Sequence, residues 1–75
     1  MEILKNVRWE RYQTNLHACR KEHGQNVVWH VYSYNTLVAV QSDHTLRELD
    51  YWSVTTRKHV NYAARQLGLE VVHVH

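Results

Sequence analysis

Hydroxyl and basic side chains crowd one short stretch of the chain, residues 51–59, which reads YWSVTTRKH. A helix is expected to begin here, and the free backbone N–H groups of a helix start, together with hydroxyls and cations, can bind a phosphate or a carboxylate. The candidate anion-binding residues are Ser53, Thr55, Thr56 and Arg57. Simple capping by Ser53 or Thr55, with Arg57 and Lys58 in solvent, explains the same residues and is the favoured alternative.

Histidine is unusually frequent, with seven residues in the chain, and two of them suggest a metal site. His73 and His75 alternate at the C-terminal end, so a strand would place both imidazoles on one face, as many His-based metal sites require. A third ligand would have to come from His17, His23, His30, His44 or His59, and no spacing selects one. We therefore favour solvent-exposed histidines over a metal site, and we expect no cofactor.

Aromatic and basic residues suggest a third candidate, a nucleic-acid surface. Trp29, Tyr32 and Tyr34 lie on one expected strand, and bases can stack on the aromatic rings of a sheet beside cations. The cations that could flank these rings are Arg8, Arg11, Arg20, Lys21, Arg57, Lys58 and Arg65. Because the chain has no phenylalanine, its rings are needed for packing, so use in the core or in a protein interface is favoured over base stacking.

No residue pattern typical of an enzyme is present, and we predict that the protein is not one. Cys19 lacks a recognisable nucleophile signature, and a single cysteine is more often a small buried apolar residue. The serines, Ser33, Ser42 and Ser53, lack the setting of a nucleophile elbow. Glu48 and Asp50 fall on one strand face, but beside Arg47 they resemble an ordinary solvated edge.

Length and composition set the limits on these sites. A chain of 75 residues is expected to form one small domain, residues 1–75, with a marginal core. One cysteine excludes an internal disulfide, which suits a reducing cytoplasm. The net charge of +2 is too small to imply nucleic acid by itself. We expect neither a membrane span nor secretion, because no apolar run approaches about 20 residues and the start lacks an apolar signal segment.

In the N-terminal half, the sequence signals for the helices and strands that would position these side chains differ in clarity. Residues 1–24 fit both helical and strand spacings, and we favour an extended segment near 5–12 followed by a short helix near 15–23 that ends at Gly24. Residues 27–34 are dense in β-branched and aromatic residues and predict a strand. Residues 36–40 predict a second strand or a continuation of the first.

The C-terminal half has the clearest helix. A turn over 41–44 should lead to a strand over 45–49 that pairs antiparallel with the preceding strand. Val60, Ala63, Ala64 and Leu67 have the spacing of a buried helical stripe, and Gly68 is placed to end the helix before a short strand over 69–75. The expected fold is α+β, a three- or four-stranded, mainly antiparallel sheet with one or two helices packed on one face.

Two stretches carry a resemblance to a known group. They are Tyr-Ser-Tyr-Asn-Thr followed by an apolar run at 32–40, and Trp-Ser-Val-Thr-Thr-Arg-Lys-His at 52–59. In these motifs the chain resembles small uncharacterised proteins of tailed bacteriophages, over roughly residues 30–67. The resemblance implies a phage origin and an accessory role, in the cytoplasm of the host cell, and it transfers no catalytic residue.

Such an origin favours stoichiometric binding to a host protein or nucleoprotein complex, including inhibition of a host defence in the manner of an anti-CRISPR protein. A ring-rich hot spot among charged residues suffices for this. The candidate contacts are Tyr32, Tyr34, Tyr51, Trp52, Arg57 and Lys58. The alternative function is a small nucleic-acid-binding module that uses the sheet aromatics and basic residues. A homodimer through the C-terminal edge strand is a further expectation.

Overall fold

The computed structural model describes residues 3–74, without the side chains of residues 3, 4 and 23. Within that range the chain forms six strands, one short 3-10 turn and one α-helix. Their bounds are β1 (Ile3–Arg8), η1 (Glu10–Tyr12), β2 (Leu16–His23), β3 (Asn26–Ser33), β4 (Thr36–Ser42), β5 (Thr45–Glu48), α1 (Val54–Leu67) and β6 (Glu70–Val72).

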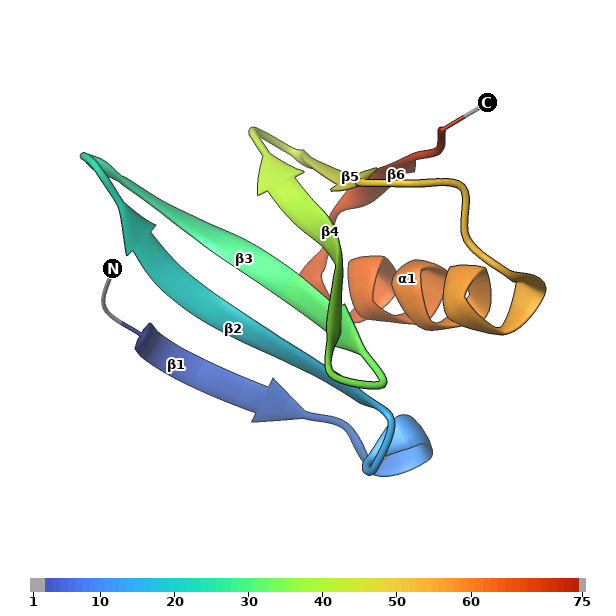
Figure 1. Cartoon of the computed structure of the whole chain (residues 1–75). Helices are drawn as coiled ribbons and strands as arrows, with labels where there is room; N and C mark the ends of the chain where they lie inside the picture. Colours follow the sequence, from blue (N-terminus) through green and yellow to red (C-terminus); the bar gives the residue numbers. More distant parts are fainter. Residues whose placement is uncertain (1–2, 75) are drawn as a thin grey trace.

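The strands form one sheet in which spatial order follows chain order, from β1 to β6. The first five strands pair antiparallel as a meander, whereas β6 pairs parallel with β5 because α1 carries the chain back across the sheet. Figure 1 shows α1 on one side of the curved sheet. The expected α+β class with a mainly antiparallel sheet is confirmed, while the expected three or four strands are an undercount.

The helix predicted over 15–23 is wrong, because these residues form β2 at an interior position of the sheet. β2 pairs with β1 on one side and along its whole length with β3 on the other, from Leu16 opposite Ser33 to His23 opposite Asn26. Gly24 has φ +62° and serves the β2–β3 turn rather than a helix end. The hydrogen bonds of two neighbouring strands outweigh the weak local signals that favoured a helix. The extended segment expected over 5–12 is likewise divided between β1 and η1.

The other predicted elements are found close to their expected places. β3 and β4 cover the strands predicted over 27–34 and 36–40, and β5 pairs antiparallel with β4 as expected. α1 begins after Ser53 and ends at Gly68. The φ of Gly68 is +72°, and its backbone N–H donates to carbonyl groups of the last turn. β6 is shorter than the strand predicted over 69–75, and His75 lies outside the described residues.

The core lies between α1 and the sheet face that the helix covers. Leu16, Ala18 and Val31 come from neighbouring strands, and all three are fully buried against Val60 and Ala63 of the helix. The rings of Trp9, Tyr12, Trp29, Trp52 and Tyr62 pack around this cluster as partly buried groups. Alternation along the strands turns the intervening residues to the opposite sheet face, which no helix covers within residues 3–74.

Candidate functional site

The two motifs that carry the phage resemblance meet in the folded chain. Ser33 Oγ lies 2.8 Å from His59 Nδ1, and each residue is only 2 % exposed. The rings of Tyr12 and Tyr34 lie against the imidazole, with centroids 4.6 and 5.6 Å away. Burial lowers the pKa of His59 below its ordinary value of 6.5. Because the hydroxyl and the imidazole are both buried, a substrate cannot reach them. Their hydrogen bond joins β3 to α1 inside the core.

The uncovered sheet face carries a small cationic cluster around Tyr32. Its ring stacks on His17 with centroids 4.9 Å apart and planes 3° apart, and its hydroxyl is a hydrogen-bond partner of the Lys21 ammonium. Burial, followed by the positive charges of Arg8 and Lys21, lowers the pKa of His17. The three-ring stacking surface considered from the sequence does not form here. Trp29 instead packs against the core, and Tyr34 lies against His59.

The outward side of α1 carries basic side chains and no acidic one. The helix sequence, VTTRKHVNYAARQL, contains three basic residues, one histidine and no acidic residue. Lys58, Asn61 and Arg65 recur at the three- and four-residue spacings that place side chains on one helix face. Across a pocket of about 330 Å³ this row faces η1, where the Arg11 guanidinium lies 5.5 Å from the ring centroid of Tyr12. We call Arg11, Lys58, Asn61 and Arg65 the α1 ridge.

A second pocket, of about 360 Å³, lies along the same helix, next to the end of β6. Val54, Arg57, Lys58, Asn61 and His73 line it, so it shares Lys58 and Asn61 with the α1 ridge. We call it the α1–β6 pocket. The pocket has no acidic residue among its described lining, and three of its five lining side chains are basic or imidazole groups.

Glu48 lies beneath this pocket and corrects one expectation from the sequence. Its side chain is 0 % exposed rather than part of a solvated edge. One oxygen lies 2.7 Å from His73 Nδ1 and accepts the backbone N–H of Val74, whereas Oε2 has no hydrogen-bond partner and lies 3.6 Å from Arg57 Nε. Alternation explains the burial, because Glu48 shares the helix-facing side of β5 with Leu46. Asp50, which lies beyond β5, is exposed as expected.

The hydroxyl groups of the candidate anion site serve mainly to start the helix. Ser53 Oγ accepts the backbone N–H of Thr56 at 3.3 Å and also donates to the Thr56 hydroxyl, while Thr55 is exposed. Of the four predicted residues, Arg57 lines the α1–β6 pocket, together with Lys58, Asn61 and His73. Asn61 is not among the residues predicted from the sequence. Its spacing of four and three residues from Arg57 and Lys58 is the signal that could have identified it.

The six predicted contact residues do not form one patch. Tyr51 and Arg57 are together, with the guanidinium carbon 5.3 Å from the ring centroid, and Tyr51 is 67 % exposed. Lys58 follows on the helix. Trp52 is half-buried, and its indole N–H donates to the carbonyl of Val38. Tyr34 is 56 % exposed at the β3–β4 turn. Tyr32 lies on the opposite, uncovered sheet face.

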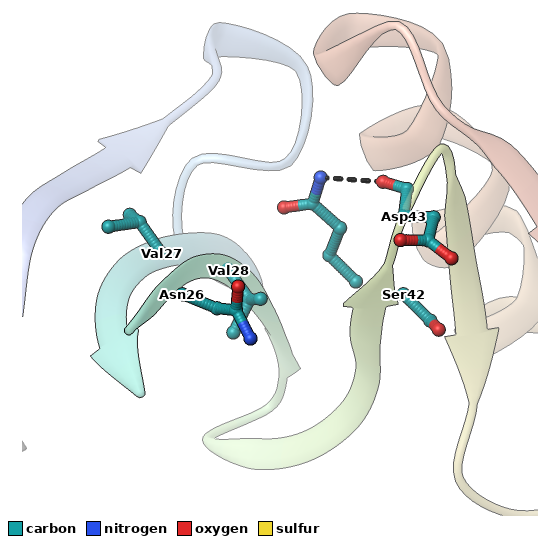
Figure 2. Close-up of a pocket in the computed structure, with 6 residues that line it drawn as sticks. Asn26, Val27, Val28, Ser42 and Asp43 are labelled. Atoms are coloured by element: carbon teal, nitrogen blue, oxygen red, sulfur yellow. Dashed lines mark hydrogen bonds between the residues drawn. The ribbon is translucent and has the colours of Figure 1, made fainter. Parts of the chain in front are cut away.

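A third pocket lies where β3 and β4 separate, and its chemistry is different. The ladder between these strands ends at His30 and Val40, and beyond it the Gln41 side chain bridges the gap. Its amide oxygen accepts the Trp29 backbone N–H at 3.0 Å, and its amide nitrogen donates to the carbonyl of Asp43, a bond that Figure 2 shows as a dashed line. The described lining includes one carboxylate and no cation, so this pocket does not suit an anion.

The structure can be compared with the metal and membrane expectations only over the residues that it describes. His73 directs Nδ1 to Glu48, whereas His75 lies outside the described residues. Among the side chains that the structure describes, no group of three or more His, Cys, Asp or Glu is arranged to hold a metal ion. Over the same residues, no helix has the length and apolar character required to cross a membrane.

These features define a small α+β protein in which one helix covers a meander sheet and turns a cationic face outward. A family model described as "Family of unknown function (DUF8033)" matches residues 5–72, and the chain belongs to this family. Searches of curated proteins and of solved structures found no match.

Proposed function

We propose that this protein acts by stoichiometric binding, and that its α1 ridge contacts the phosphate backbone of a nucleic acid, free or within a host nucleoprotein complex. Arg11, Lys58 and Arg65 are exposed, and no acidic side chain lines the pocket between them. Such a surface favours a polyanion over a protein of mixed charge. A phage origin, a place in the host cytoplasm and a role as a host-defence inhibitor belong to the same proposal, with the motif resemblance as their support.

The observation that carries the proposal is the absence of acidic residues from α1, combined with cations on its outward row. Lys58 and Arg65 are seven residues apart, which on a helix is about 10 Å along the axis. One nucleic-acid strand rises about 3.4 Å per nucleotide, so the ridge matches roughly three nucleotides. Tyr12 and Tyr62 line the same pocket and offer apolar faces beside the cations.

Fluorescence anisotropy with labelled single- and double-stranded DNA and RNA over a range of salt concentrations tests this proposal. Three phosphate contacts predict a slope of log K against log salt of about −2 to −3. The double variant Lys58→Ala with Arg65→Ala should weaken binding and make the slope shallower by about 1.5 to 2. Arg47→Ala is the matched control, because Arg47 is exposed on the opposite sheet face. No binding at low salt, or equal loss in the control, would contradict the proposal.

A protein target is the second candidate, and one observation favours it. Tyr51 is mostly exposed and lies beside the Arg57 guanidinium, a ring and cation pair of the kind that is enriched at binding hot spots. Affinity capture from nuclease-treated host lysate tests it. A protein recovered reproducibly with the wild-type chain and lost with Tyr51→Ala supports this second function. Recovery of nucleic acid alone from the same lysate without nuclease treatment, with steep salt dependence, supports the first.

A further inference from the structure

We propose that the α1–β6 pocket is a binding site for a phosphate monoester, and specifically for the 5′-terminal phosphate of a nucleic-acid strand. Nucleic acid as the carrier of that phosphate rests on the proposed function. The phosphate site is lined by side chains that lie far apart in the sequence. Arg57 belongs to α1, whereas His73 follows β6.

Four side chains that can donate hydrogen bonds line the pocket. Arg57 meets Glu48 through Nε, and its side chain is 28 % exposed. His73 uses Nδ1 for Glu48, and its side chain is 30 % exposed, so Nε2 is the ring nitrogen that does not contact this carboxylate. Lys58 is exposed at the rim and has no carboxylate partner among the described residues. Asn61 adds an amide group.

The buried carboxylate of Glu48 holds two of these groups in place. Its contacts with His73 and Arg57 fix an imidazole and a guanidinium before any ligand arrives, which lowers the entropic cost of binding. Glu48 Oε2 accepts no hydrogen bond and lies 3.6 Å from Arg57 Nε, so it meets the guanidinium as an ion pair and is not itself a contact for a phosphate. The negative charge of Glu48 offsets Arg57, and Lys58 stays as the uncompensated cation.

A monoester fits this arrangement better than a diester does. A terminal phosphate carries a charge of about −1.5 to −2 at pH 7 and presents three acceptor oxygens, so donors can approach it from several sides. A backbone phosphodiester presents two free oxygens and one charge. Because Lys58 and Asn61 line both the α1 ridge and the pocket, a strand that follows the ridge would reach the pocket with its end.

Two oligonucleotides of identical sequence, one with a 5′-phosphate and one with a 5′-hydroxyl, test the inference by anisotropy. The wild-type chain should bind the phosphorylated strand about tenfold more tightly, the gain expected from one charge-assisted hydrogen bond. Val54→Glu should abolish this preference, because Val54 is exposed and lines the α1–β6 pocket but not the pocket beside the ridge. Thr55→Glu is the matched control, since it places the same charge one residue away, outside the lining of the pocket.

Equal binding of the two oligonucleotides by the wild-type chain overturns the inference. Equal loss of preference in Val54→Glu and Thr55→Glu also overturns it, because the effect would then be one of general charge. Binding of the 5′-hydroxyl strand reports on the proposed function alone, so the two proposals can fail separately.

A second measurement needs no nucleic acid. Inorganic phosphate should shift the NMR signals of the His73 ring saturably in the wild-type chain and in Thr55→Glu, and much less in Val54→Glu. Saturation with that pattern supports the site even where no oligonucleotide binds. A shift that does not saturate, or one that is equal in all three proteins, indicates an adventitious ion only and overturns the inference.

Discussion

The hydrogen bond between Ser33 and His59 is the residue-scale feature with the clearest energetic consequence. Both groups are buried, so Ser33→Ala would leave His59 Nδ1 without its partner. An unsatisfied buried polar group costs about 1–3 kcal/mol, and we expect the free energy of unfolding to fall by about that amount. Urea denaturation measures it. Ser42→Ala, at the exposed end of β4, is the matched control and should change stability by less than about 0.5 kcal/mol.

Protonation of buried imidazole gives a second prediction at this scale. The pKa of His59 is lowered in the folded chain, and so is that of His17, so the unfolded chain binds more protons below about pH 6.5. The free energy of unfolding should therefore be highest above that pH and fall as pH decreases from about 7.5 toward 5.5. His59→Gln should flatten this dependence. A stability that stays constant or rises on acidification would contradict the assignment.

At the scale of elements, α1 depends on the residue that starts it. Ser53 caps the helix through the backbone N–H of Thr56, and loss of such a cap costs about 1 kcal/mol. Ser53→Ala should lower the free energy of unfolding by that amount in a urea titration. Thr55→Ala should be neutral or slightly stabilising, because Thr55 is exposed inside the first turn and alanine has the higher helix propensity. The reverse order of the two variants would show that Thr55 is the cap.

Elements with one dominant pattern could be predicted from the sequence, and those decided by distant partners could not. β3 and α1 carry strong strand and helix periodicities, and Gly68 ends the helix in the expected conformation. β2 lacks such a pattern, because its state is set by pairing with β1 and β3. The candidate site divides in the same way. Arg57 and Lys58 were predicted as contacts, whereas their meeting with His73 depends on β6 lying parallel to β5.

At the scale of the whole molecule, the one-sided helix makes the protein asymmetric. Core side chains fill the side of the sheet that α1 covers, and the outward side of that helix carries the α1 ridge and the α1–β6 pocket. The opposite sheet face carries a separate cationic cluster around Tyr32. Variants on the two faces can therefore show which side a binding partner contacts. For this reason Arg47→Ala is the control for the double variant Lys58→Ala with Arg65→Ala.

The sheet has two edges, β1 and β6, and pairing of two copies through β6 stays a prediction. β6 has three residues, and Val72, the last of them to pair with β5, is 38 % exposed, so antiparallel addition of a second β6 would bury this side chain. The short strand offers few main-chain hydrogen bonds, so the dimer should be weak and form only at high concentration.

Light scattering over a concentration series should show the mass rising from 9.0 kDa. Val72→Lys should hold the mass at the monomer value, because a charged edge residue opposes pairing, whereas Val27→Lys on the interior strand β3 should leave the rise unchanged. A constant mass in the wild-type chain, or equal effects of the two lysine variants, would exclude association through this edge.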